Sequence, residues 1–267
     1  MHVTRAVILD WAGTTVDYGS RAPVTAFVEL FRTQGVHVTE QQARRPMGAA
    51  KKDHLRLMMG DRDVAEAWRT VHGYLPDEAT VDKVFTGFAA IQQESILAHA
   101  RVIDGVPELM QWLRSNDIRV GSGTGYARSL MKPLAAEAAR QGYEPECIVV
   151  PDDVPGGRPA PWLALRAAML LDAYPMARCV KVGDTVVDMQ EGRNAGMWAV
   201  GVTLTGNEVG LSKEEVDALP ADERIRRMEH AAATLRAAGA HTVIETIADL
   251  SRAIEEVERR GAAGERP

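Results

Sequence analysis

Short apolar runs that end in polar or glycine-rich residues recur along this 267-residue chain. The runs occupy residues 6–9, 118–120, 147–150, 179–182 and 198–202. Fully buried parallel strands have this near-continuous apolar character. Helical stretches separate the runs, and residues 107–114, for example, carry apolar side chains on one broad face. The pattern therefore predicts an α/β fold, a Rossmann-like open parallel sheet with helices between its strands.

The alternation of strands and helices stops between the first and second apolar runs, where the sequence is almost entirely helical. We expect an inserted α-helical cap domain at residues 19–100. The α/β catalytic core domain would then consist of residues 1–18 and 101–267. The connecting segments at residues 17–20 and 100–105 contain glycines and suit a hinge between the two domains.

Charge and hydropathy exclude several classes of protein. The chain carries 31 Lys and Arg against 37 Asp and Glu, a net charge of −6, and lacks the broad basic surface that nucleic-acid binding requires. No stretch approaches about 20 uninterrupted apolar residues, so we expect no membrane partner. The N-terminal residues run directly into the first strand without the arrangement of a signal peptide, which predicts a cytoplasmic protein.

Polar residues follow several of the predicted strands where each one ends. In an open α/β sheet these carboxyl ends form the ligand site, so Asp10, Ser122, Thr124 and Asp184 should converge. Asp10 could act as a nucleophile or hold a cation, or it could merely cap a turn. Together with Asp184 and Asp188 it offers the oxygen ligands that Mg²⁺ prefers.

These residues resemble the signature of the haloacid dehalogenase superfamily of phosphotransferases. That signature contains a strand-end Asp nucleophile, a Ser or Thr after a second strand, a basic residue and a later acidic pair. The corresponding residues here are Asp10, Ser122 or Thr124, Arg158, and Asp184 with Asp188. The superfamily usually has a second Asp two positions after the nucleophile, which protonates an oxygen leaving group. This chain has Ala12 there, which opposes cleavage of phosphate esters.

A different leaving group removes the need for that acid. Lys51 lies in a predicted cap helix that begins at Met47 and includes Gly48. A lysine there could form a Schiff base with a carbonyl substrate. The protonated imine would accept electrons, so that a carbon leaving group departs as an enamine and a carbon–phosphorus bond can break.

The two segments around Asp10 and Lys51 together are similar to those of the phosphonatase family within this superfamily, and the resemblance covers about residues 3–210. It implies a homodimeric hydrolase that uses Mg²⁺ to convert phosphonoacetaldehyde, a small-molecule phosphonate, to acetaldehyde and phosphate. It also implies a Schiff base on Lys51, an aspartyl phosphate on Asp10 and a place in 2-aminoethylphosphonate degradation. Ser20 and Lys52 depart from the family pattern, which has cysteine in some members and an apolar residue at these positions.

The resemblance also implies a role for each site residue. Mg²⁺ would be held by Asp10, the Ala12 carbonyl and Asp184, with Asp188 ordering a metal-bound water. Substrate-binding residues would be Gly48, Ser122, Thr124, Arg158, His54, Tyr126 and Met47; of these, Thr124 and Arg158 would contact the phosphonyl oxygens, while His54, Tyr126 and Met47 would surround the lysine. Two alternatives remain: a phosphate monoesterase of the same superfamily, and a non-catalytic protein that kept the fold.

Overall fold

The computed structural model of the protein describes residues 2–267, and its centre is a six-stranded sheet in which every strand pair is parallel. The strand order is β3-β2-β1-β4-β5-β6. The strands are β1 (Ala6–Leu9), β2 (Arg119–Gly123), β3 (Cys147–Val149), β4 (Cys179–Gly183), β5 (Trp198–Val202) and β6 (Thr242–Ile244). The predicted fold class is confirmed.

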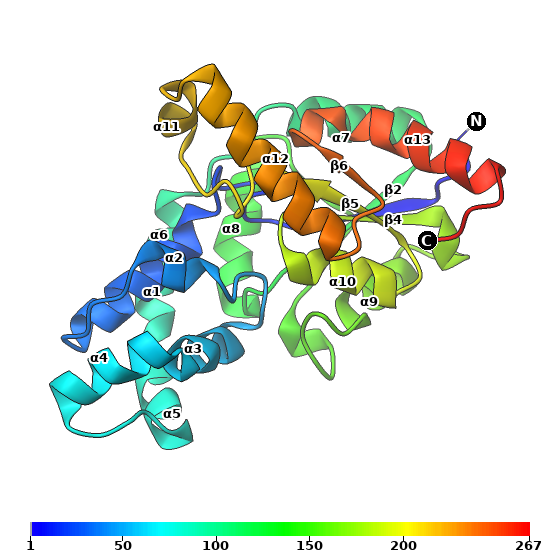
Figure 1. Ribbon diagram of the computed structural model, residues 1–267. Coiled ribbons are helices and arrows are strands. Elements are labelled where there is room, and N and C mark those ends of the chain that lie inside the picture. The colour runs from blue at the N-terminus through cyan, green and yellow to red at the C-terminus, as the bar shows by residue number, and fades with distance from the viewer. Residues whose placement is uncertain (1) are drawn as a thin grey trace.

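Helices cover both faces of the sheet because alternate strand residues point to opposite sides. Val7 and Leu9 pack with residues of α7 (Val106–Ser115), α8 (Arg128–Arg140) and α13 (Leu250–Ala262). Ala6 and Ile8 pack on the other face with α9 (Trp162–Leu170). On that second face α10 (Val186–Asn194) and α12 (Ala221–Ala237) pack against β5. Figure 1 shows α7 and α13 above the sheet and α9 and α10 below it.

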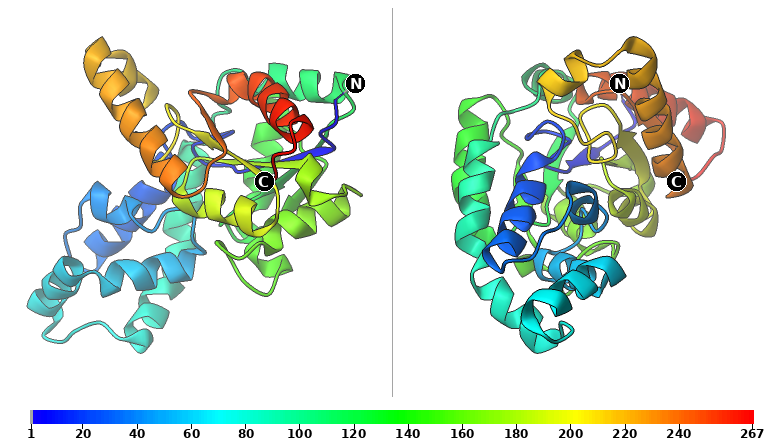
Figure 2. Two further views of the ribbon diagram at one scale, coloured as in Figure 1. Left: turned by 45° about the vertical axis from the view of Figure 1, so that its right-hand side comes forward. Right: turned by 60° about the vertical axis from the view of Figure 1, so that its left-hand side comes forward.

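Six helices lie between β1 and α7 and form a second hydrophobic core of their own. They are α1 (Arg21–Thr33), α2 (Glu40–Arg44), α3 (Lys51–Gly60), α4 (Arg62–His72), α5 (Glu78–Thr86) and α6 (Phe88–Ala98). We call these six helices the helical insertion. Figure 2 shows them as a group set to one side of the sheet. The exact division at residues 18/19 and 100/101 stays a prediction.

The remaining elements are short. They are α11 (Lys213–Asp217) and three 3₁₀ turns at Pro151–Asp153, Met176–Arg178 and Ile247–Asp249. Among residues 2–267, no helix combines the length and apolar character needed to cross a membrane.

The helices of the insertion differ in detail from the predicted ones. The last part of the insertion forms two helices, α5 and α6, which are separated at Gly87. The helix expected from Met47 begins only at Lys51. Residues before it form turns instead, with the Met47 amide donating to the Arg44 carbonyl and the Ala49 amide to the Pro46 carbonyl. Lys51 is consequently the first residue of α3.

The two connections between the insertion and the sheet lie side by side. The Asp17 amide donates to the Arg101 carbonyl at 3.0 Å, and the Ile103 amide donates to the Thr15 carbonyl at 2.9 Å. The Asp17 carboxylate also accepts the free amides of Arg21 and Ala22 at the start of α1. This carboxylate therefore ties the first connection to the first helix of the insertion.

The core of the insertion depends on Phe27. Its ring stacks on His54 at 3.9 Å and on Phe88 at 4.5 Å between ring centroids, and the side chain is fully buried. We expect Phe27→Ala to lower the free energy of unfolding by about 3–5 kcal/mol, as measured by urea denaturation. Tyr174→Ala is the control, because Tyr174 is 80% exposed and should change stability by less than about 0.5 kcal/mol. Equal effects of the two substitutions would contradict this assignment.

Candidate active site

Three carboxylates from separate parts of the chain meet at the carboxyl ends of the strands. Asp10 follows β1, whereas Asp184 and Asp188 come from the end of β4 and the first turn of α10. One oxygen atom of each carboxylate lies within 4.8 Å of the others, and all three side chains are buried. The predicted convergence of strand-end acids is therefore present.

Local hydrogen bonds hold two of these acids in place. Asp184 accepts from the Thr14 hydroxyl at 3.0 Å and from the Asn207 amide at 2.8 Å. Asp188 accepts from the Thr185 hydroxyl at 2.5 Å, while the Thr185 side chain caps the start of α10. A capping box therefore fixes Asp188 as a direct consequence of how the helix begins.

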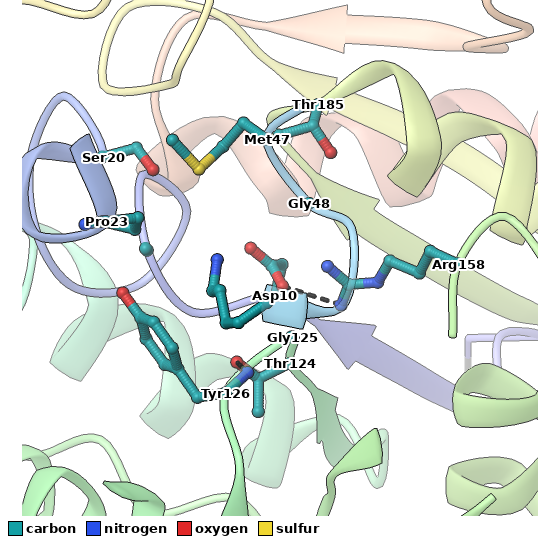
Figure 3. Close-up of a pocket in the computed structure, with 12 residues that line it drawn as sticks. Asp10, Ser20, Pro23, Met47, Gly48, Thr124, Gly125, Tyr126, Arg158 and Thr185 are labelled. Atoms are coloured by element: carbon teal, nitrogen blue, oxygen red, sulfur yellow. Dashed lines mark hydrogen bonds and ion pairs between the residues drawn. The ribbon is translucent and has the colours of Figure 1, made fainter. Parts of the chain in front are cut away.

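Arg158 is the cation at the centre of the acidic group. Its guanidinium contacts Asp10 at 2.7 Å, Asp188 at 3.1 Å and Glu191 at 2.9 Å, with only 1% of the side chain exposed. Lys181 on β4 reaches Asp188 at 2.6 Å and Glu191 at 3.5 Å. Buried charges of this kind persist only when they are paired. Figure 3 shows the contact between Asp10 and Arg158 at the cavity.

The acids respond differently to this environment. Burial raises the pKa of Asp10, although Arg158 opposes the shift. Burial, with the charges of Asp10 and Asp188, raises the pKa of Asp184 well above its ordinary value. Burial would also raise the pKa of Asp188, but Arg158 and Lys181 outweigh it, and the pKa falls. Burial thus disfavours the charged forms of Asp10 and Asp184, whereas Arg158 and Lys181 stabilise the charged form of Asp188.

That donor set fits a hard divalent cation. Hard cations such as Mg²⁺ take oxygen ligands, and one or two carboxylates are enough when waters and a substrate oxygen supply the rest. Asp10 and Asp184 provide these oxygens, and one oxygen of each lies within 4.8 Å of the other. The site can therefore hold a metal ion.

Lys51, on the helical insertion, lines the same cavity as Asp10. Its side chain is buried, with Nζ 5.1 Å from the centre of the Tyr126 ring. Burial lowers the pKa of Lys51 to about 8, and the Arg158 charge adds to this effect against the opposing charge of Asp10. Burial, and not the neighbouring Lys52, is the main cause of this shift. Lys52 instead faces outward, 42% exposed, and pairs with Glu78 and Asp82.

The cavity between sheet and insertion is small. It encloses about 20 Å³, which is little more than one water molecule occupies. Its lining comprises Asp10, Ala12, Ser20, Pro23, Met47, Gly48, Lys51, Thr124, Gly125, Tyr126, Arg158 and Thr185. Figure 3 shows ten of these residues labelled around it, with Met47 and Tyr126 on opposite sides. The structure therefore brings most of the predicted site residues into one enclosed space.

Two predicted substrate-binding residues lie outside this lining. Ser122 accepts from the Trp11 indole at 3.0 Å and donates to the Cys147 carbonyl at 3.3 Å. His54 lies behind Lys51, where its Nε2 bonds to the Ala43 carbonyl at 2.8 Å and must therefore carry the proton. Burial lowers the pKa of His54 well below its usual value. The ring is neutral, and its Nδ1 lone pair has no partner among residues 2–267.

Gly48 permits a close approach between the insertion and the start of α10. Its φ is +88°, a left-handed conformation that glycine adopts without strain. A Cβ atom at this position would lie 2.6 Å from the Thr185 hydroxyl and still closer to Val187. The turn before α3 thus docks against the start of α10, and its position determines where Lys51 sits relative to Asp10.

Comparisons with known proteins decide the family. The profile of the haloacid dehalogenase-like hydrolases matches residues 4–196. The chain is 47% identical to the phosphonoacetaldehyde hydrolase of Nitratidesulfovibrio vulgaris over 98% of its length and 94% of that protein's. It is 48% identical to the enzyme of that name from Bacillus cytotoxicus, with 96% and 97% covered. The crystal structure of a phosphonoacetaldehyde hydrolase-like protein from Oleispira antarctica matches with a TM-score of 0.97 at 44% identity, covering 99% and 96%.

The chain belongs to the phosphonoacetaldehyde hydrolase family. This membership, within the haloacid dehalogenase-like hydrolases, confirms the resemblance seen in the sequence.

Several contacts in this phosphonatase site were not anticipated from the sequence. Lys181 and Glu191 complete the buried charge cluster, and Asn207 donates its amide to Asp184. A lysine is almost never fully buried without an acidic partner. The position of Lys181 inside an otherwise apolar strand was therefore a signal that a buried acid lies beside it. Asn207 acts through its backbone, and no side-chain pattern could have revealed it.

Substitution of Gly48 tests whether its close approach to Thr185 positions Lys51. We expect Gly48→Ala to lower kcat/KM by about 5- to 150-fold, because overpacking of this kind costs about 1–3 kcal/mol and would hold Lys51 away from Asp10. Gly60→Ala is the matched control. Gly60 ends α3, no atom of residues 2–267 lies within 4 Å of the place its Cβ would take, and kcat/KM should stay unchanged. An unchanged kcat/KM in Gly48→Ala would show that the approach at Thr185 does not position the lysine.

Proposed function

We propose that this phosphonatase-family chain hydrolyses the carbon–phosphorus bond of phosphonoacetaldehyde, giving acetaldehyde and phosphate. One observation carries the proposal: a buried lysine with a lowered pKa and a buried nucleophilic carboxylate, Lys51 and Asp10, line the same cavity. Ala12 also lines this cavity, and its methyl group can donate no proton to an oxygen leaving group. The arrangement suits a leaving group that departs as carbon.

The first step uses the amine of Lys51. In its neutral form the amine attacks the substrate aldehyde, and loss of water gives a Schiff base. The lowered pKa supports this role, since about a tenth of a lysine with a pKa of 8 is neutral at pH 7, against about one part in 3,000 at 10.5. The ring of Tyr126 lies beside the lysine and limits where the imine can point.

The second step transfers the phosphonyl group. A carboxylate oxygen of Asp10 attacks phosphorus, the carbon–phosphorus bond breaks, and its electron pair moves into the protonated imine to form an enamine. Arg158 lies 2.7 Å from Asp10 and can donate to the phosphonyl oxygens through its planar fork. Thr124 lines the cavity beside it and can supply a further hydrogen bond.

The last steps release both products. Water hydrolyses the aspartyl phosphate to phosphate and regenerates Asp10. Protonation of the enamine at carbon gives the imine of acetaldehyde, and a second water releases acetaldehyde and Lys51. Because imine formation freed one water, the sequence of steps consumes one water in all.

We infer that Mg²⁺ is the metal ion, held by the carboxylates of Asp10 and Asp184 and by the Ala12 carbonyl. Asp188 would order a water ligand of the ion. When bound, the ion supplies positive charge that reduces repulsion between Asp10 and the phosphonate dianion. The oxygen-only donor set supports this choice.

The insertion must also move during turnover. A cavity of about 20 Å³ cannot admit phosphonoacetaldehyde, so the helical insertion would open about its two connecting segments and close again once the imine has formed. The family resemblance further supports a homodimer that acts in the degradation of 2-aminoethylphosphonate.

The activity itself is tested by incubating the protein with phosphonoacetaldehyde and Mg²⁺ and following acetaldehyde with a coupled dehydrogenase. We expect turnover by the wild type and a loss of at least about 10³-fold in Lys51→Arg, because a guanidinium keeps the charge but forms no imine. Borohydride should trap substrate on the wild type and not on Lys51→Arg.

Lys52→Arg is the matched control, since Lys52 is the neighbouring lysine and faces away from the cavity. It should retain both turnover and trapping. An active Lys51→Arg variant, or activity on a chromogenic phosphate ester that exceeds activity on the phosphonate, would refute the proposed reaction.

The lowered pKa of Lys51 predicts a pH dependence. Below pH 8 the neutral fraction of the amine rises about tenfold per pH unit, and above pH 8 it levels off. The initial rate of borohydride-trapped adduct formation should therefore increase between pH 6 and 8 and reach a plateau near pH 9. A rate that keeps rising to pH 10 would mean that the reacting amine has an ordinary pKa.

A further inference from the structure

Arg44, the last residue of α2, reaches from the helical insertion to two segments outside it. One nitrogen, Nη1, donates to the Gly19 carbonyl at 2.8 Å, in the connection between β1 and α1. The other, Nη2, donates to the Gly210 carbonyl at 2.7 Å, in the loop after β5. A longer contact joins Nη1 to the Asn207 side-chain oxygen at 3.4 Å. One guanidinium thus joins three separate segments of the chain.

This guanidinium is held mainly by neutral oxygens. Its nearest carboxylate partner is Glu40 at 3.9 Å, which is 56% exposed, whereas only 14% of the Arg44 side chain is exposed. Burial lowers the pKa of Arg44, and Glu40 only partly opposes the shift. Such a residue contributes through the geometry of its several donors more than through an ion pair, and a lysine could not reproduce it.

The loop that Arg44 contacts also holds the metal-side carboxylate. The Asn207 amide donates to Asp184 at 2.8 Å, and the Thr205 hydroxyl donates to the Gly13 carbonyl at 2.8 Å. The Thr205 carbonyl in turn accepts the Gly19 amide at 2.7 Å. Residues 205–210 therefore connect the acidic cluster, the first connecting segment and Arg44.

Glycines at the two ends of this loop allow both contacts. A Cβ atom at Gly206 would lie 2.6 Å from the Cβ of Asp184. At Gly210, where φ is +66°, a Cβ atom would lie 2.7 Å from Nε of Arg44 and 2.8 Å from its Cζ. The loop is thus fitted closely to the carboxylate at one end and to the guanidinium at the other.

We propose that Arg44 is a positioning residue that fastens the docked helical insertion to residues 205–210 and so keeps the Asn207 amide on Asp184. It acts through Asn207 and does not itself line the cavity. Its effects on turnover and on Mg²⁺ affinity rest on the proposed function, whereas its effect on loop protection does not. The docking of the insertion and the position of the metal-binding carboxylate Asp184 are then linked by the side chain of Arg44.

The experiment compares Arg44→Ala and Arg44→Lys with Arg45→Ala. Arg45 is the adjacent arginine, 61% exposed, and pairs with Asp61 within the insertion at 2.7 Å. Mg²⁺ binding to the full-length protein is measured by titration calorimetry, and backbone protection of residues 205–210 by hydrogen exchange. Groups that orient metal ligands typically change metal affinity by about 10- to 100-fold, so we expect the Mg²⁺ Kd to rise about tenfold in Arg44→Ala.

Arg44→Lys should show most of the same loss, and residues 205–210 should exchange faster in both Arg44 variants. Arg45→Ala should match the wild type in both measurements. Wild-type Mg²⁺ affinity and wild-type loop protection in Arg44→Ala would overturn the proposal, as would an equal loss in Arg45→Ala.

A second variant covers the case in which Arg44→Ala fails to fold. Gly210→Ala perturbs the same contact from the loop side, and we expect it to raise the Mg²⁺ Kd in the wild-type background. In an Arg44→Lys background the added methyl group meets a narrower side chain, so Gly210→Ala should raise the Mg²⁺ Kd by a smaller factor. Strictly additive effects would show that Gly210 and Arg44 act independently and would overturn the proposed link.

The two proposals fail separately. Absence of acetaldehyde production by the wild type would refute the proposed reaction, while the hydrogen-exchange measurement would still decide the role of Arg44. Conversely, if the enzyme is active but its Mg²⁺ affinity does not change on substitution of Arg44, the proposed reaction stands and the proposed role of Arg44 is refuted.

Discussion

The buried guanidinium of Arg158 is the interaction on which the site depends. It contacts three carboxylates from two places in the chain: Asp10 after β1, and Asp188 and Glu191 on α10. Without it these buried acids would repel one another, and a buried carboxylate without a partner is strongly destabilising. Lys181 supports the same cluster from inside β4. Catalytic charge and fold stability are thus carried by the same side chains.

The core of the fold and its acidic cluster could be predicted because they follow from local rules. A parallel strand buried on both faces must be apolar, and its polar successor must lie at the carboxyl edge of the sheet. Asp10 and Asp184 obey these rules. The importance of Lys51 came from a resemblance to a family, since an isolated helical lysine is ordinarily solvated. Pattern alone could not tell it from Lys52.

The features of the site that the sequence did not predict depend on how the helical insertion docks against the rest of the protein. Lys51 faces the cavity and Lys52 faces solvent because α3 begins at position 51, after turns that no periodicity in the sequence announced. Gly48 was expected to let backbone approach a substrate, and it also meets Thr185 on the sheet side. Arg44 had no visible motif, because its partners are mostly backbone carbonyls from segments far away in the chain.

The small cavity and the lowered pKa of Lys51 have a joint consequence. A neutral amine reacts readily with small electrophiles at neutral pH, but here Lys51 is buried in the cavity between the helical insertion and the sheet. The rate at which a dilute acylating reagent labels this lysine would therefore depend on how often the helical insertion opens. The acylation rate of Lys51, measured by mass spectrometry, would then report the opening of the insertion without any attached probe.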